Sequence, residues 1–288
     1  MRILITGGAG MLGHQLYRHL SAHYDARVTL RQELNAYTDF DIFNNNNSYP
    51  GVDLRITAQI LNVISDFHPD VVVNAAGIVK QRPDGQDNIP NIEINALLPH
   101  RLSFLCKVAG ARLVHISTDC IFSGKLGHYK ETDTLDPVDV YGFSKVLGEV
   151  ADPHCITLRT SIIGKELLRK TGLFEWFIST KGPVKGFTNA IFSGFTTIEL
   201  SRIIEMLIAI HPSASGIYNV SSEPISKYDL LKLIKSKMRL KTEIIPDGEF
   251  KCDRSLDSTK FRSEFTYNSP SWEVMIDELA QDYLERTK

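Results

Sequence analysis

The chain opens on an apolar run that meets a glycine-rich turn and is followed by an amphipathic stretch. The run Ile3–Ile5 predicts a buried parallel strand, and glycines follow it at positions 7, 10 and 13. In a strand–turn–helix unit with these spacings, Gly7 permits the tight turn and Gly10 lets the backbone approach a pyrophosphate. Gly13 lets the helix pack on the strand. This order of elements predicts a Rossmann-type start to the fold.

The stretch after the turn supplies the rest of the predicted phosphate site. Leu16 and Leu20 continue one apolar face, as a helix packed on a sheet requires. The first N–H groups of that helix, at Met11, Leu12 and Gly13, lie where a helix N-terminus holds phosphate oxygens. We therefore predict a bound dinucleotide here, with a plain structural turn as the alternative interpretation.

Length and composition exclude several classes of protein. The 288 residues carry a net charge of −2 with 43% hydrophobic residues, so we expect one large or two modest globular domains without a basic surface for nucleic acid. No apolar run approaches the roughly 20 residues of a membrane span, and Met1 leads straight into a strand, which leaves no room for a signal peptide. The four cysteines are scattered, which argues against a disulfide framework or a metal site and favours the cytoplasm.

Strand and helix patterns alternate up to about residue 160, which predicts a doubly wound parallel α/β sheet. We assign residues 1–160 to an NAD(P)-binding domain and residues 161–288 to a smaller, mostly helical substrate-binding region, with the chain free to cross back between them. The strands are expected at Ile3–Ile5, Arg27–Leu30, Val71–Asn74, Arg112–Ile116, Cys155–Leu158, Ile217–Val220 and Glu243–Ile245. The helices are expected at Leu12–His23, Thr57–Phe67, Asn95–Val108, Tyr141–Val150, Thr197–Ile210, Lys227–Met238 and Ser271–Glu285.

The spacing G-x-x-G-x-x-G after Thr6 resembles the short-chain dehydrogenase/reductase superfamily, in its extended branch. The second strand ends at Arg31, where an acidic residue would accept the ribose hydroxyls of NAD, and an arginine there can pair with the 2′-phosphate of NADP. We therefore expect NADPH to be preferred, with NAD possible. The resemblance also places Asp53 and Leu54 against the adenine, although Asp53 could instead cap the following helix.

A second cofactor segment is expected at the end of the third predicted strand. The residues Asn74-Ala75-Ala76-Gly77 follow the apolar run Val71–Val73, and small side chains there let the backbone pass beside a cofactor. The superfamily carries a motif of this type, with Ala75, Ala76 and Gly77 at the cofactor. Related proteins often have an asparagine where this chain has Asn95, so that residue is either functional or structural.

The chemistry is expected at Thr118, Tyr141 and Lys145. Tyr141 and Lys145 are four residues apart and share a helix face, and a nearby ammonium group favours the phenolate that a tyrosine acid–base group must form. The hydroxyl of Thr118 can orient a substrate oxygen. The same Y-x-x-x-K spacing recurs at Tyr228 and Lys232, which we interpret as an ordinary amphipathic helix.

Further motifs narrow the resemblance to the dTDP-4-dehydrorhamnose reductase family. They are Ser117-Thr118-Asp119, Val140-Tyr141-Gly142, Leu158-Arg159-Thr160-Ser161 and, near the C-terminus, Arg254-Ser255-Leu256-Asp257-Ser258-Thr259-Lys260-Phe261. The resemblance implies an NAD(P)H-dependent reductase of the 4-keto group of a nucleotide-linked 6-deoxyhexose, working in polysaccharide or glycoconjugate synthesis. It also implies that Thr118, Tyr141 and Lys145 are catalytic, with Tyr141 as the proton donor.

Position 120 departs from that family, which usually has tyrosine there. Cys120 replaces the glutamate that related 4,6-dehydratases need, so the dehydratase hypothesis loses its carboxylate. A cysteine here resembles GDP-fucose synthase, in which it serves as an epimerisation base with a histidine partner. No histidine occurs between His154 and His211, so an epimerase–reductase using Cys120 and an inert packed cysteine both remain open.

The later part of the chain offers weaker signals. Residues 181–187 and 190–197 suggest a basic, aromatic loop pair suited to a nucleotide diphosphate, or else plain connecting loops. We expect Thr197 to cap the helix that follows, and Arg254 to be a candidate phosphate contact.

Two further hypotheses come from the resemblance. A non-catalytic cofactor-binding regulator is one, because an accessory subunit of methionine adenosyltransferase belongs to the same family. A homodimer is the other, since extended members pair through two helices, here Asn95–Val108 and Tyr141–Val150. Apolar contacts could come from Leu98, Leu102, Leu105 and Val146, which could equally face the sheet.

Overall fold

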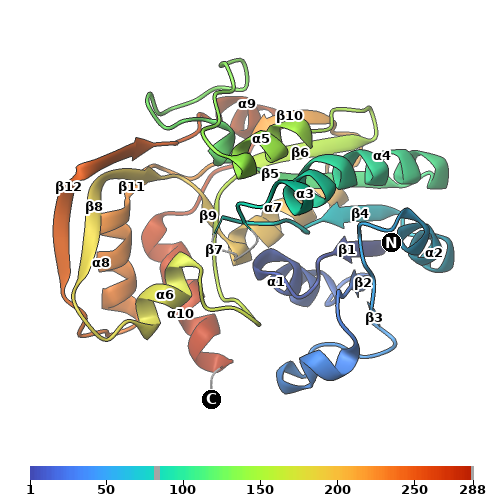
Figure 1. Cartoon of the computed structure of the whole chain (residues 1–288), viewed down its shortest axis with the longest axis horizontal. Helices are drawn as coiled ribbons and strands as arrows, with labels where there is room; N and C mark the ends of the chain where they lie inside the picture. Colours follow the sequence, from blue (N-terminus) through green and yellow to red (C-terminus); the bar gives the residue numbers. More distant parts are fainter. Residues whose placement is uncertain (81–84, 287–288) are drawn as a thin grey trace. The chain divides into compact units, whose positions relative to one another are not determined.

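A computed structural model describes residues 1–80 and 85–286, which form two compact units. The first unit contains Met1–Ser117, Asp139–Leu158 and Ser201–Ile217. The second contains Thr118–Val138, Arg159–Leu200 and the residues from Tyr218 onward. Each unit therefore combines segments that are distant in the sequence. Figure 1 gives the labels of the helices and strands used below.

A seven-stranded sheet is the framework of the fold, with strand order β10-β6-β5-β4-β1-β2-β3. The pairs β1–β2, β1–β4, β4–β5 and β2–β3 are parallel. The strands are β1 (Arg2–Thr6), β2 (Asp25–Thr29), β3 (Ser48–Tyr49), β4 (Val71–Asn74), β5 (Arg112–Thr118), β6 (Cys155–Thr160) and β10 (Gly216–Asn219). The predicted doubly wound α/β fold is confirmed, because a parallel sheet with this order needs a crossover helix between its strands.

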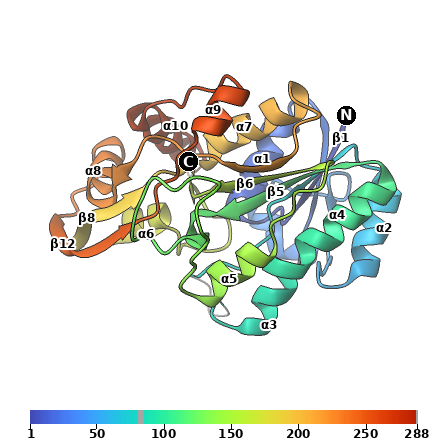
Figure 2. The same cartoon turned by 90° about the horizontal axis from the view of Figure 1, so that it is seen from above.

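Helices cover both faces of this sheet. Figure 2 shows α2 and α4 on one face, and α1 and α7 on the other. The helices are α1 (Met11–Leu20), α2 (Thr57–Phe67), α3 (Asn88–Asn91), α4 (Leu98–Ala109), α5 (Val140–Leu147) and α7 (Thr197–Ala209), with a 3-10 helix η1 (Leu34–Phe40). Apolar residues of α2 and α4 form one buried cluster with Leu4, Val72 and Leu113 from the strands, which removes apolar surface from water and holds the layers together.

The predicted helix Asn95–Val108 begins earlier and is not uniform. A π-helix, η2 (Ile92–Leu97), lies between α3 and α4. Pro99 has no N–H to donate to the carbonyl of Asn95, and this carbonyl lies close against Gly148, where a Cβ atom would be only 1.9 Å away. The local irregularity therefore accompanies close packing of η2 on the end of α5.

Residues 184–196 are mostly in strands, so the prediction of two loops here was wrong. They form β8 (Val184–Phe192) and β9 (Phe195–Thr196). Strand β8 pairs in parallel with β12 (Ile244–Asp253) and in antiparallel with β11 (Ile225–Ser226), while β9 pairs with β7 (Ile162–Ile163). Gly186 marks a close approach rather than a turn, since a Cβ atom there would lie 2.6 Å from the ring of Tyr228.

The second unit also contains short helices around these strands. They are α6 (Leu173–Ser179), α8 (Lys227–Lys237), α9 (Thr259–Glu264) and α10 (Trp272–Glu285), and the 3-10 turn η3 (Asp119–Ile121). Helix α7 begins at Thr197 itself, and the hydroxyl of Thr196 accepts the N–H of Glu199 at 3.3 Å. The cap is therefore Thr196 and the prediction of Thr197 was one residue late. None of the helices in the described parts of the chain is both long and apolar enough to cross a membrane.

Candidate active site

The glycine turn after β1 brings the start of α1 against the strand. Gly7 has a φ of +75°, and its carbonyl oxygen accepts the N–H of Gly10 at 2.9 Å. A Cβ atom at Gly13 would lie 2.2 Å from that same carbonyl oxygen. A larger residue at position 13 would therefore push the helix away from the turn.

This turn fits the phosphates of a dinucleotide. Helix α1 has no acidic residue in its first turn, and its N-cap Gly10 provides no side-chain cap. An α-helix leaves its first N–H groups without intrahelical acceptors, so those of Met11, Leu12 and Gly13 suit an anion. A Cβ atom at Gly7 would meet the backbone of Ala76 at 2.8 Å, which shows how closely the turn and the segment after β4 approach each other.

Arg31 and Asp53 lie near each other beside the end of β2. Arg31 is exposed. The Arg55 guanidinium binds the Asp53 carboxylate, with Nε–O distances of 2.9 and 3.0 Å, and lowers the pKa of that carboxyl, to which the charge of Arg31 also contributes. Leu54 packs beside the buried cluster. The alternative that Asp53 caps α2 is wrong, because the residue before Thr57 is Ile56 and the Asp53 carboxylate is bound to Arg55.

Three polar side chains lie side by side across the centre of the sheet. Thr6, Asn74 and His115 are lateral neighbours on β1, β4 and β5. Thr6 donates to the Asn74 side-chain oxygen at 2.7 Å, and the Asn74 amide lies 3.1 Å from Nδ1 of His115. All three are fully buried, and burial lowers the pKa of His115 well below its usual value, with the Lys145 charge acting in the same direction. This row fixes the strand end that leads into Ala75, Ala76 and Gly77.

The side-chain amide of Asn95 connects two segments of the first unit. Its oxygen accepts the N–H of Ile78 at 2.9 Å, and its nitrogen donates to the Ile78 carbonyl at 3.0 Å and to the Ser144 hydroxyl at 3.1 Å. Asn95 is 1% exposed. The amide therefore ties the segment after β4 to helix α5, which is a structural role.

Helix α5 carries both Tyr141 and Lys145. Its N-cap is Asp139, whose carboxylate accepts the N–H of Gly142 at 2.8 Å. Lys145 is 4% exposed, and its Nζ donates to the carbonyl oxygen of Ile116 on β5 at 2.6 Å. Burial lowers the pKa of Lys145 to about 8, while Glu149 acts in the opposite direction. A cation is thus held beneath the first turn of α5, on the same helix face as Tyr141.

Glu149 is a residue to which the sequence pattern assigned no role. Its carboxylate accepts the hydroxyl proton of Ser117 at 2.8 Å and favours the charged form of Lys145. Its position four residues after Lys145 was the available signal, since residues so spaced are neighbours on a helix.

Thr118 ends β5 and caps the turn η3 that follows. Its hydroxyl oxygen accepts the N–H of Cys120 at 3.2 Å and lies 3.2 Å from the Asp119 carboxylate. Cys120 is partly exposed, so it is not fully packed in a core. Farther along the second unit, Arg254 Nε donates to the carbonyl of Phe122 at 2.8 Å, which places that guanidinium beside this turn.

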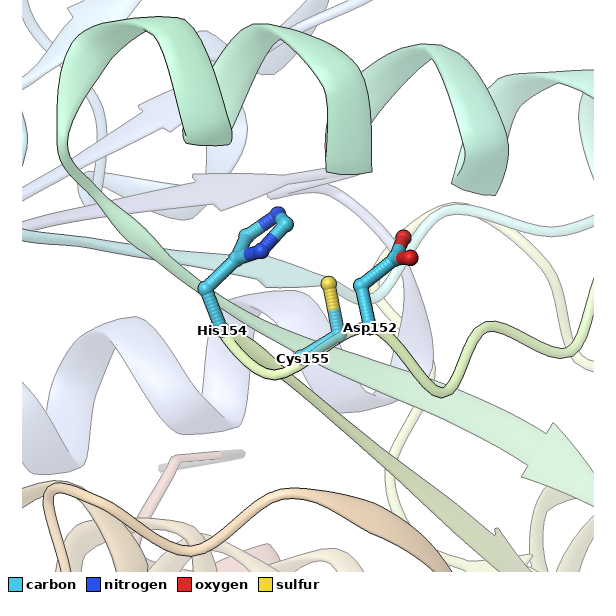
Figure 3. Close-up of side chains that lie close together, drawn as sticks. All are labelled: Asp152, His154 and Cys155. Carbon is cyan, nitrogen blue, oxygen red and sulfur yellow. The ribbon is translucent and has the colours of Figure 1, made fainter.

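Asp152, His154 and Cys155 form a separate cluster at the start of β6, with donor atoms within 4.8 Å of one another (Figure 3). Each of these three side chains is hydrogen-bonded to Ser103 of α4. The Ser103 hydroxyl donates to Asp152 at 2.5 Å and accepts from the Cys155 thiol at 3.3 Å, and His154 Nε2 lies 2.9 Å from the Ser103 carbonyl oxygen. These bonds explain the cluster as a link between α4 and β6, without a metal ion.

Comparison with known proteins shows the family of the chain. Residues 1–172 match the family model described as the RmlD substrate binding domain. The chain belongs to this family. It is 29% identical over 245 residues to a dTDP-4-dehydrorhamnose reductase of Aggregatibacter actinomycetemcomitans, covering 79% of this chain and 76% of the relative. It is 28% identical over 154 residues to methionine adenosyltransferase 2 subunit beta of Bos taurus, covering 52% and 42% of the two chains.

Solved structures extend the similarity of fold to nearly the whole chain. A hypothetical dTDP-4-dehydrorhamnose reductase from Sulfolobus tokodaii is 28% identical, with a TM-score of 0.76 and coverage of 95% of this chain and 98% of that one. A dTDP-4-dehydrorhamnose reductase from Bacillus anthracis, solved in complex with NADP, is 22% identical, with a TM-score of 0.79 and coverage of 98% of both chains. The predicted resemblance to this family is confirmed.

Proposed function

We propose that this protein is an NADPH-preferring reductase of a nucleotide-linked 4-keto-6-deoxyhexose. The observation that carries the proposal is the buried Lys145 ammonium, fixed on the Ile116 carbonyl one helical turn from Tyr141. A relative with an activity of this type, the dTDP-4-dehydrorhamnose reductase of Aggregatibacter, aligns with most of the chain. A fold shared with an NADP-bound reductase supports the choice of cofactor.

Different residues of the first unit would bind different parts of the cofactor. Gly7, Gly10 and the N–H groups of Met11, Leu12 and Gly13 would hold the pyrophosphate, and Ala75, Ala76 and Gly77 would let the backbone pass beside it. On the adenosine side, the guanidinium of Arg31 would pair with the 2′-phosphate, and Asp53 and Leu54 would flank the adenine.

The reaction needs a hydride and a proton, and the nicotinamide supplies the hydride when it is bound. Tyr141 donates its phenolic proton to the oxygen of the ketone. Lys145 stabilises the resulting phenolate and would also hold the nicotinamide ribose, and the Thr118 hydroxyl orients the substrate oxygen. Cap bonds already orient that hydroxyl, since it accepts the Cys120 N–H.

The test is NADPH oxidation, followed by absorbance, with dTDP-, UDP- and GDP-linked 4-keto-6-deoxyhexoses, and NADH in parallel. We expect one sugar to be reduced and Tyr141→Phe to lose at least 100-fold in turnover while still binding NADPH. Lack of oxidation with every sugar, from protein shown to bind NADPH, would reject the reductase function.

Two alternatives remain as outcomes of the same assays. The similarity to methionine adenosyltransferase 2 subunit beta supports a cofactor-binding regulator, whose behaviour Tyr141→Phe would not change. The partly exposed thiol of Cys120 supports an epimerase–reductase. In that case deuterium from the solvent would enter the sugar ring beside the ketone, and Cys120→Ser would abolish this exchange.

A homodimer formed through α4 and α5 is also part of the proposal. Leu98, Leu102 and Leu105 face the core. The exposed apolar side chains are Phe104 and Val108 of α4, Phe143 and Leu147 of α5, and Leu97 at the end of η2. His100 of α4 bonds to the Leu147 carbonyl at 2.7 Å, which joins the two helices, and their exposed apolar side chains suit a second copy of this chain.

The cellular location is the last part of the proposal. No disulfide joins the four cysteines, all of which lie in the described residues. We place the protein in the cytoplasm, where thiols stay reduced.

A further inference from the structure

A second cation lies beside Tyr141. The Nζ of Lys80 is 5.6 Å from the centroid of the Tyr141 ring, within the range of a cation–π interaction. It is also 2.5 Å from Oδ2 of Asp139. Lys80 follows β4 in the chain, whereas Tyr141 and Asp139 belong to the start of α5, and all three residues are in the first compact unit.

The ion pair is built into the cap of α5. Asp139 uses one carboxylate oxygen for the Gly142 N–H at 2.8 Å and the other for Lys80. The side chains of Lys80 and Asp139 are 25% and 22% exposed, so water screens this pair less than it screens a pair on an open surface. Lys80 is therefore attached to the turn of helix that carries the Tyr141 ring.

Other charged groups lie on α5 and on the elements packed against it in the described part of the first unit. Lys145 lies one turn along α5, and Glu149 favours its charge. On η2, which packs on α5, Glu93 lies 3.8 Å from the Arg55 guanidinium, and α3 carries no charged residue. His115 on β5 is buried and neutral. Lys80 and Asp139 thus place opposite charges beside the ring.

We propose that Lys80 is a positioning residue for Tyr141, which orients the ring and neutralises the Asp139 carboxylate beside it. This inference rests on the proposed function, in which Tyr141 is the proton donor. The role of Lys80 differs from that of Lys145, because Lys80 acts on the tyrosine through the helix cap and the ring face.

Two substitutions should move the ionisation of Tyr141 in opposite directions. Lys80→Met removes a positive charge beside the Tyr141 ring and the Asp139 carboxylate, so the phenol should ionise at higher pH. Asp139→Asn removes the negative charge but keeps a good N-cap, so the phenol should ionise at lower pH. A shift of about 0.5 to 1 pH unit in each direction is expected for charges at this distance in a partly shielded site.

The first readout is the pH profile of kcat/KM for ketone reduction. Reduction requires the protonated phenol, so the alkaline limb should move to higher pH in Lys80→Met and to lower pH in Asp139→Asn. An increase in KM without movement of the limb would mean that Lys80 binds substrate, and would overturn the proposal. Movement of the alkaline limb by the same amount and in the same direction in both variants would also overturn the proposal.

The second readout needs no substrate. Phenolate absorbance is titrated in the folded protein, and the curve of Tyr141→Phe is subtracted to isolate Tyr141. Opposite shifts without any ketone reduction would support the positioning role of Lys80 while rejecting the proposed function. Normal reduction with no shift in either variant would reject the role of Lys80 and leave the reductase function standing.

The chain provides a matched control at Tyr228. Lys232 lies 5.1 Å from the Tyr228 ring and 3.7 Å from Asp229, in the same Y-x-x-x-K spacing but on the exposed side of α8. Lys232→Met should leave both the pH profile and the Tyr141 titration unchanged. A shift equal to that of Lys80→Met would show a general charge effect and overturn the proposal.

Discussion

The Nζ atom of Lys145 lies 2.6 Å from the carbonyl oxygen of Ile116, and this bond joins helix α5 to strand β5. The ammonium group is buried, and burial lowers its pKa from 10.5 to about 8. At neutral pH it therefore still carries its charge, as a partner of a phenolate must, while it loses that charge in mildly alkaline solution. The bond to Ile116 fixes where this charge is placed.

The first prediction concerns the cost of burying Lys145. Between pH 8 and 10.5 the unfolded chain holds a proton that the folded protein has lost, so the stability of the wild type rises with pH in this window. The difference corresponds to about 3 kcal/mol. Lys145→Met lacks this dependence, so its stability relative to the wild type should fall by about that amount from pH 7 to 10.5.

Urea denaturation at each pH measures this effect. Lys232→Met, on an exposed helix face, is the control and should show a stability difference that does not vary with pH. The interpretation of Lys145 fails if its substitution gives the same flat difference.

Local sequence patterns predicted the central sheet well. The strand Val71–Asn74 and the helix Thr57–Phe67 were predicted with the bounds that the structure has. Both are short segments in which the apolar pattern itself determines the conformation. The strands β8 and β12 were different, because their pairing joins Val184 to Ile244 and β12 has mostly exposed or half-buried residues without alternation. Only the start of β12 was predicted, as the strand Glu243–Ile245, because a long-range contact defines the rest of both strands.

The second prediction concerns Asn95. Asn95→Ala leaves the N–H and carbonyl groups of Ile78 without their partners, and both are buried. The free energy of unfolding should fall by roughly 3 kcal/mol. Thermal and urea unfolding measure this, with the exposed Asn46→Ala as a control that should change stability by less than about 0.5 kcal/mol. A variant with unchanged stability but lost activity would show that Asn95 is catalytic instead.

The third prediction concerns the choice of cofactor. Arg31→Ala removes the guanidinium proposed to pair with the 2′-phosphate, so KM for NADPH should rise by about 10- to 100-fold while KM for NADH stays nearly constant. Steady-state kinetics with both cofactors give the ratio. Arg18→Ala, another exposed arginine but at the end of α1, should leave the ratio unchanged. An unchanged ratio in Arg31→Ala would remove the basis for the NADPH preference.

The fourth prediction concerns the apolar surface of α4. Phe104 is 66% exposed, and Phe104→Arg should convert a dimer to a monomer because it places a charge in the proposed contact. Light scattering coupled to size exclusion measures the mass. Leu284→Arg, at a 49% exposed position on α10, should leave the mass of the wild type unchanged. A wild-type protein that is already a monomer at high concentration would reject this surface as a dimer contact.

Only some of the residues around the site could be predicted from the sequence. Tyr141 and Lys145 were predicted from their shared helix face together with the motifs around them, because the same spacing recurs at Tyr228 and Lys232. Lys80 carried no comparable signal, since it precedes Asp139 by 59 residues and only folding forms their ion pair. The bonds of Asn95 likewise reach Ile78 and Ser144, at separations of 17 and 49 residues.

The last prediction concerns His115 at low pH. Its folded pKa lies well below the ordinary 6.5, so below pH 6.5 the unfolded chain binds a proton that the folded protein excludes. Stability should therefore fall on acidification by about 1.4 kcal/mol per pH unit from this residue alone. His115→Asn should make the fall between pH 6.5 and 5 shallower by about that slope, as measured by urea denaturation. His23→Asn, at an exposed position, should keep the wild-type slope, and an equal slope in His115→Asn would show that His115 is not the group that titrates.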